Sequence, residues 1–175
     1  MEEIERMTRL SLGMILTSQG VPFLHSGIEM HRSKGGHHDS YRSPDDVNQI
    51  EWGNKSAYLD LMHFTMKCIE LRKQHPAFRM SNGDLVRKNL SFFKKYIPGV
   101  IAYQLKDHPN GDSWKNILVL FNGNNYSVEY EIPLKKWLIV AQNGEINPQG
   151  ISHVTTGKVR LHPISMMIFA EEQID

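Results

Sequence analysis

The stretch SQGVPFLHSGIEMHRSKGGHHDSYRSPDDVNQIEW, residues 18–52, decides the fold that the sequence predicts. It opens with a short apolar segment at residues 21–25, which is typical of a buried β-strand; Pro22 restricts it to the start of a strand or an edge. A loop of roughly thirty residues, rich in glycine, serine and aspartate, follows. Loops of this length inside a compact domain are uncommon and often functional. We therefore expect a site at the end of this strand.

Two amphipathic helices are expected on either side of this stretch. Residues 3–17 repeat apolar side chains at helical spacing, and Gly20 follows as a stop signal. Residues 56–74 show the same spacing and end before Pro76. A helix, one strand, a loop and a second helix leave the strand without ladder partners. We therefore expect this part to be the end of a larger α/β sheet or barrel, whose remainder lies outside the sequence.

The pattern changes after about residue 80. Short segments rich in β-branched and aromatic residues alternate with turn signals such as Asn122-Gly123 and Asn143-Gly144. The strands expected from this pattern are residues 91–96, 100–105, 116–121, 127–132, 137–142, 158–162 and 165–170. Strands at this spacing favour an antiparallel sandwich.

The predicted fold class is therefore α+β, with two parts. Residues 1–80 are expected to form the last βα unit of a barrel, and residues 81–175 an all-β antiparallel sandwich that could fold alone. The exposed apolar helix faces are expected either to self-associate or to dock on the sandwich.

Composition excludes several classes of function. With 20 basic and 19 acidic residues the net charge is +1, which gives no electrostatic case for binding nucleic acid or an anionic membrane. No apolar run approaches the roughly eighteen residues of a membrane span. The single cysteine, Cys68, excludes an intrachain disulfide framework, and its place on an apolar helix face predicts an inert thiol in the core.

Several short motifs together carry a resemblance to a known family. Residues 18–27 resemble the last barrel strand of glycoside hydrolase family 13, and the following loop resembles that of type I pullulanases. The loop residues that match are Arg32-Ser33-Lys34-Gly35, Ser40-Tyr41, Ser43-Pro44-Asp45, Asn48 and Trp52. The helix end is similar too, at Leu71-Arg72 and His75-Pro76-Ala77-Phe78-Arg79. The resemblance is strong over residues 6–80 and architectural beyond them.

Two positions depart from the family pattern. Asp39 stands where an asparagine is usual, and Ser33 where a threonine is usual. The first change places a charge near the sugar-facing region and is expected to alter binding. The second is minor.

The resemblance implies a retaining (β/α)8-barrel enzyme that cleaves α-1,6 linkages in pullulan, glycogen or amylopectin. Such chemistry needs an ionised carboxylate nucleophile and a protonated carboxylic acid about 5 Å apart. None of the family motifs that carry these groups occurs in the sequence, so no catalytic residue is expected here and the isolated chain should be inactive. The implied partner is an α-glucan. No cofactor is expected in this chain, and any calcium site would lie in the missing part of the barrel.

The loop holds the candidate site residues. Those expected to contact the glucan are Arg32, Lys34, Tyr41 and Asn48, and those expected to orient neighbours behind the site are Glu29 and Asp45. Position alone, just beyond a strand end, makes Glu29 a candidate acid, but the resemblance gives it a supporting role. Other readings stay open: Arg32 and Lys34 can hold loop carboxylates, and Tyr41 can plug the loop onto the barrel.

The cluster His37-His38-Asp39 has the ligand types of a zinc site. However, adjacent histidines point in different directions, no spaced histidine pair accompanies them and no cysteine joins. No metal site is therefore predicted.

Aromatic residues have two possible roles. Trp114, Tyr130 and Trp137 could form a sugar platform, but core packing and cross-strand pairing are more frequent roles for such residues. Trp52 is predicted to anchor the loop in the core.

Two other functions compete with an enzyme fragment, namely a stand-alone carbohydrate-binding module and an interaction protein that docks its helices on a partner. The strand at residues 21–25, which has no partner strand, and the long polar loop favour the enzyme fragment, because a stand-alone sugar-binding module would not contain half a barrel unit.

Overall fold

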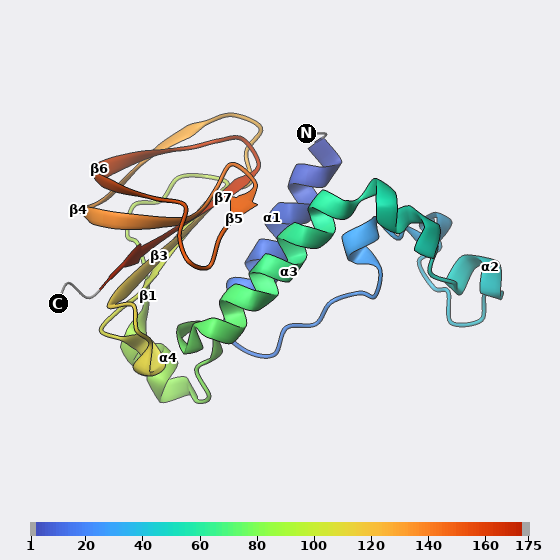
Figure 1. The fold of residues 1–175 in the computed structure, drawn as a ribbon, viewed down its shortest axis with the longest axis horizontal. Coiled ribbons are helices and arrows are strands. Elements are labelled where there is room, and N and C mark those ends of the chain that lie inside the picture. Colours follow the sequence, from blue (N-terminus) through green and yellow to red (C-terminus); the bar gives the residue numbers. More distant parts are fainter. Residues whose placement is uncertain (1–2, 173–175) are drawn as a thin grey trace.

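The computed structural model describes residues 3–172 and shows two long helices packed against one antiparallel sheet (Figure 1). The helices are α1 (Glu3–Thr17), α2 (Asp45–Asn48), α3 (Leu59–Gln74) and α4 (Gly83–Asn89). The strands are β1 (Leu90–Phe92), β2 (Val100–Leu105), β3 (Asn116–Asn122), β4 (Val128–Gln142), β5 (Glu145–Ile146), β6 (Ser152–Leu161) and β7 (Ser165–Glu171). Short 3₁₀ helices lie at Ile28–Met30, Lys34–Gly36, Trp52–Ala57, Pro76–Arg79 and Pro109–Gly111.

The strand order in the sheet is β1-β2-β3-β7-β4-β5, with β6 paired to β4. All pairings are antiparallel. Strand β4 is 15 residues long and pairs with β6 along most of its length and with β7 near its end. The fold therefore depends on β4, which joins the β6 edge to the centre of the sheet.

Two apolar cores lie on opposite faces of the sheet, because successive strand residues point to opposite sides. On β3, Ile117 and Val119 share a core with Leu12 of α1 and Leu71 of α3. The alternate residues, such as Leu118, pack in a second core with side chains of β4, β6 and β7. The helices thus cover one face of the sheet, and the second core gives the β-rich part its sandwich character.

The structure confirms the two long helices and several of the strands that the sequence predicts. Helix α1 has the predicted bounds, α3 begins three residues later than expected, and β2 spans the predicted residues 100–105. In contrast, residues 128–142 form one strand, β4, where two strands were expected at 127–132 and 137–142. The register with β6 shifts between Glu131 and Lys135, and the strand continues without a turn. Strand β6 also starts earlier than predicted, at Ser152.

Helices α2 and α4 and strand β5 were not expected from the sequence. Asn82-Gly83 reads as a turn signal, yet it starts helix α4: the Asn82 side-chain oxygen accepts a hydrogen bond from the Leu85 amide at 2.9 Å, which caps the helix. Strand β5 is only two residues long and pairs with the end of β4.

The strand predicted at residues 21–25 is wrong for the described chain. The segment is irregular in the structure, and the side chains of Val21 and Phe23 are 95% and 88% exposed. The physical reason is the absence, among residues 3–172, of a neighbouring strand that could exchange backbone hydrogen bonds with it. An apolar composition alone cannot hold a strand without a ladder partner.

The side chain of Trp52 is 69% exposed, so its predicted role as a core anchor is wrong. It begins the 3₁₀ helix Trp52–Ala57, which leads into α3. Trp114, Tyr130 and Trp137 are buried, which confirms core packing and excludes a sugar platform built from these three rings. Cys68 is also buried as predicted, and burial raises the pKa of its thiol to about 12.

The predicted boundary near Met80 stays a prediction. In the structure one core contains residues from both sides of it, including Phe64 and Phe78 before the boundary and Leu105 after it. The apolar faces of α1 and α3 dock on the sheet, which is one of the two expected outcomes. Within residues 3–172, no helix combines the length and apolar character needed to cross a membrane.

Candidate functional site

The segment that leads into the long loop is anchored by a buried arginine. The Arg72 guanidinium donates to the carbonyls of Leu16 at 2.9 Å, Ser18 at 2.8 Å and Gly20 at 2.5 Å. The last carbonyls of a helix have no partner within the helix, so Arg72 satisfies the end of α1 and the chain beyond it. Burial and the charge of Arg79 lower the pKa of Arg72, but arginine titrates far above neutral pH and remains charged.

Two further side chains fix the same junction. The Gln19 amide donates to the Ala77 carbonyl at 2.8 Å and accepts from the Met80 amide at 3.0 Å. From β2, the Tyr103 hydroxyl donates to the Thr17 carbonyl at 2.9 Å. Burial raises the pKa of Tyr103, which keeps its hydroxyl protonated as a donor. Residues 16–20 are therefore held by α3, by the 3₁₀ helix after it and by the sheet.

The loop itself has an unusual backbone. Gly27, His31, Lys34, Gly35 and Gly36 all have positive φ angles, between 52° and 86°. Gly27 has a φ of 86°, and a Cβ atom there would lie 3.0 Å from the Arg32 side chain, so a larger residue would be strained. Such conformations persist only where surrounding contacts hold them, and they cluster at functional sites.

Arg32 ties the two ends of the loop together. Its guanidinium donates to the Ser26 carbonyl at 3.2 Å, to the Gln49 carbonyl at 3.2 Å and to the Asn48 carbonyl. These bonds use Nε and both terminal nitrogens of the guanidinium. The structure therefore gives Arg32 a loop-holding role through backbone carbonyls rather than through loop carboxylates.

Asn48 and Lys34 also hold the loop. The Asn48 amide nitrogen donates to the carbonyls of Ser40 at 2.8 Å and Ser43 at 2.9 Å, and the Lys34 ammonium donates to the Ser40 hydroxyl at 2.7 Å. The amide oxygen of Asn48 and two ammonium hydrogens of Lys34 remain for other contacts.

The other candidates lie apart from this network. Tyr41 is 72% exposed, with the Arg42 guanidinium 5.0 Å from its ring centroid. Glu29 is half-buried in a 3₁₀ turn, and Asp45 is exposed at the start of α2. The residues of the His37-His38-Asp39 cluster are exposed, and no group of metal-ligating side chains was found among the described residues.

A cavity of about 230 Å³ opens on the inner side of the loop. Arg32 and Lys34 line it together with His37, whereas Tyr41, Asn48, Glu29 and Asp45 do not. Asp46 and Glu51 also line it and were missed by the sequence reasoning. Asp46 directly follows the matched motif Ser43-Pro44-Asp45, and this position in the sequence could have marked it as a candidate site residue.

A second unpredicted contact fastens the end of α3 to the β-rich part. His75 Nδ1 lies 2.9 Å from Asp112 Oδ1, and the His75 ring stacks on Trp114 with centroids 3.4 Å apart. The Asp112 carboxylate also accepts from the backbone amides of Ala77 at 3.1 Å and Trp114 at 2.9 Å. Burial opposes ionisation of Asp112, but these hydrogen bonds outweigh it and lower its pKa.

Replacing Arg32 with lysine is expected to loosen the loop without unfolding the chain. Lysine offers one ammonium in place of a planar fork and cannot reach three carbonyls in this geometry. Amide hydrogen exchange over residues 26–50 should become about tenfold or more faster, while exchange in β3 stays unchanged. The exposed Arg42→Lys variant is the matched control. Unchanged exchange in the loop would contradict the role assigned to Arg32.

Comparisons with known proteins identify the class. Residues 86–145 match the family model described as the all-beta domain of pullulanase. Pullulanase of Bacillus subtilis is 39% identical over 127 residues, which cover 71% of this chain and 17% of the relative. Among solved structures, pullulanase from Bacillus acidopullulyticus superposes with a TM-score of 0.90 and 38% identity, over 98% of this chain and 21% of that one.

A further structure, type I pullulanase from Bacillus subtilis complexed with maltose, superposes with a TM-score of 0.86 and 30% identity, over 99% of this chain and 24% of that one. The fold and sequence thus place the chain in the class of pullulanase-related and isoamylase-related proteins. Within that class the chain belongs to the pullulanase family. It spans about a fifth of the length of these relatives, as expected for a C-terminal portion.

Proposed function

We propose that the chain forms one wall of the glucan-binding cleft in an enzyme that hydrolyses α-1,6-glucosidic bonds of pullulan, glycogen or amylopectin. Residues 21–25 serve as the last strand of its (β/α)8 barrel, α3 as the last barrel helix, and the loop that follows residue 25 faces the sugar. The pullulanase relatives, one of them a complex with maltose, support an α-glucan as the substrate.

One observation carries this proposal. Residues 16–20 are held by Arg72, Gln19 and Tyr103, yet the residues that follow have exposed apolar side chains and no strand neighbour within the described chain. A segment that is anchored so firmly at its start and lacks ladder partners is suited to complete a sheet supplied by other parts of the enzyme.

The chemistry of the reaction decides which roles fall to this chain and which to the rest of the enzyme. Retaining hydrolysis needs a nucleophile and an acid, which we assign to parts of the enzyme outside this chain. Arg32 and Asn48 hold the loop in shape and, with Lys34 and Tyr41, are the residues we propose to contact the glucan. Glu29 and Asp45 support them. A loop held by hydrogen bonds from its own side chains keeps its sugar-facing groups in place before substrate binds, which lowers the entropic cost of binding.

A chimaera tests this function. Residues 1–175 would replace the aligned segment of the Bacillus acidopullulyticus pullulanase, and release of reducing sugar from pullulan would be measured. Activity is expected in the chimaera and not in the same enzyme truncated before the segment. A chimaera that folds, as judged by its thermal transition, but does not hydrolyse pullulan would refute the proposal.

The isolated chain is expected to release no maltotriose from pullulan, because the residues that attack and protonate the glycosidic bond lie outside it. Chromatography of the oligosaccharide products after prolonged incubation checks this. Any release above a heat-treated sample would show that a carboxylate of this chain performs the chemistry.

A further inference from the structure

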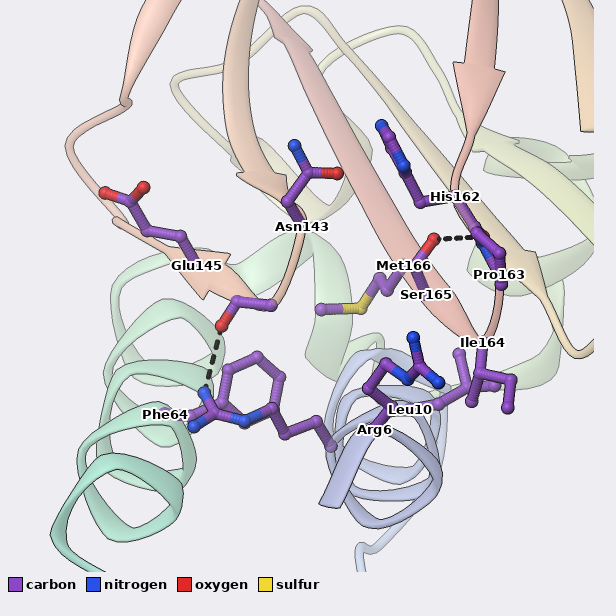
Figure 2. A pocket seen from close by; sticks show the side chains of 12 residues that line it. Arg6, Leu10, Phe64, Asn143, Glu145, His162, Pro163, Ile164, Ser165 and Met166 are labelled. Atoms are coloured by element: carbon purple, nitrogen blue, oxygen red, sulfur yellow. Dashed lines mark hydrogen bonds between the residues drawn. The ribbon is translucent and has the colours of Figure 1, made fainter. Parts of the chain in front are cut away.

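A second pocket, of about 210 Å³, lies between the helices and the ends of the sheet, away from the long loop (Figure 2). Four segments enclose it: the first half of α1, the middle of α3, the turn between β4 and β5, and the turn between β6 and β7. Its apolar walls come from Leu10, Phe64, Ile164 and Met166. Arg6 extends from α1 toward the space between Ile164 and Met166 (Figure 2).

The Arg6 guanidinium lacks the partners that its neighbour has. Arg9 donates to the Glu5 carboxylate at 2.5 and 3.0 Å and to the Gly144 carbonyl at 3.0 Å, and lies 5.2 Å from the Phe64 ring centroid. In contrast, the buried Nε of Arg6 has no hydrogen-bond partner among residues 3–172. A buried donor without an acceptor is costly and rare in native structures. Within the described chain Arg6 therefore lacks the ion pair and carbonyl contact that fix Arg9, and its guanidinium remains available to a ligand that enters the pocket.

The opposite wall is built on a strained residue. Ile164 has a φ of +46°, a conformation that is unusual for any residue except glycine and an outlier for a β-branched one. It is held there by its backbone amide, which donates to the Asn124 carbonyl at 2.9 Å. Strain of this kind persists where surrounding contacts enforce it, often at ligand sites. The wall that faces Arg6 is therefore preformed by the turn between β6 and β7.

These features select the chemistry of the ligand. A guanidinium presents parallel N–H groups that match the two oxygens of a carboxylate or phosphate. The carboxylate closest to Arg6 in sequence, Glu5, is bound to Arg9, and Glu145 at the pocket rim is exposed. The apolar walls favour a hydrocarbon body, and the volume is below the roughly 300–1,000 Å³ of drug-sized ligand sites. We propose that this pocket binds a small organic anion, with its oxyanion on Arg6 and its apolar part against Ile164 and Met166.

Titration of the 175-residue chain with hexanoate tests this proposal, because hexanoate combines a carboxylate with a short alkyl chain. Methionine methyl groups labelled with ¹³C report directly through Met166 in the pocket wall. We expect a saturable shift of the Met166 methyl signal. 1-Hexanol, which keeps the alkyl chain, and acetate, which keeps the carboxylate, should each bind about tenfold or more weaker.

Variants locate the site. Arg6→Met should weaken hexanoate binding about tenfold or more, and Arg6→Lys should give an intermediate loss, since a lysine retains the charge but not the fork. The exposed Arg160→Met on β6 is the matched control and should bind as the wild type does. Thermal unfolding of each variant verifies its fold; if Arg6→Met does not fold, Arg6→Lys and Arg6→Gln carry the comparison.

Three results would overturn the proposal. These are the absence of a saturable shift, equal affinity for hexanoate and 1-hexanol, and equal affinity of wild type and the folded Arg6 variants for hexanoate. Displacement of hexanoate by maltose would show instead that the pocket takes a neutral sugar. The pocket lies apart from the long loop, so none of these outcomes depends on whether the chimaera hydrolyses pullulan.

Discussion

Replacing Arg72 with methionine is expected to lower the free energy of unfolding by about 3 kcal/mol, the upper end of the range for losing hydrogen bonds to a charged group. The change removes donors to the carbonyls of Leu16, Ser18 and Gly20, which then lie without partners at the end of α1. Urea unfolding at neutral pH, followed by circular dichroism, measures the loss.

The neighbouring Lys73→Met is the matched control, because Lys73 is exposed on the same helix and carries the same charge. We expect its effect to stay within about 0.5 kcal/mol, as for most surface substitutions. Hydrogen exchange should also become faster over residues 16–20 in Arg72→Met. Equal stability of the two variants would show that Arg72 does not hold the start of the extended segment.

Replacing Asp112 with asparagine is expected to lower the free energy of unfolding by about 1.5–3 kcal/mol at pH 7, the range for hydrogen bonds to a charged group. The carboxylate accepts from His75 and from the amides of Ala77 and Trp114. An asparagine side chain accepts only at its oxygen, and its NH₂ group would face a donor. The exposed Asp107→Asn is the control and should cost little.

The same pair of variants makes a prediction about pH. Hydrogen bonds lower the pKa of Asp112 in the folded chain, so its contribution is fully present above its ordinary value of about 3.9. It is lost as pH falls through the lowered value. The stability difference between wild type and Asp112→Asn should therefore be constant near neutral pH and shrink in acid below pH 4. A difference that grows in acid would contradict the sign of this shift.

Much of the architecture could be predicted from local patterns. The periodic apolar residues of α1 and α3 and the β-branched run of β2 specify their own elements, and those elements form as expected. Strand β4 was predicted as two strands, at residues 127–132 and 137–142. In the structure, β4 pairs with β6 on both sides of a register shift, and the strand continues between the two predicted segments.

The candidate site was predicted less completely. The loop and its polar residues were found, but the carbonyls that bind Arg32 and Asn48 lie up to 17 residues away in the chain, and side-chain chemistry does not specify such partners. Glucan contacts at these residues remain predictions. The pairing of His75 with Asp112, 37 residues apart, left no pattern in the sequence.

The sequence by itself determined the two long helices, most of the strands and the resemblance to pullulanases, because these depend on residue types at short separations. Only the tertiary structure decided which polar groups are used to hold backbone, as Arg72 and Arg32 are, and which remain without a partner, as the buried Nε of Arg6 does within residues 3–172. It also showed that residues 21–25 form no strand within the described chain. The physical reason is the same in each case: a hydrogen bond needs its second group, and that group is brought close only when distant segments pack.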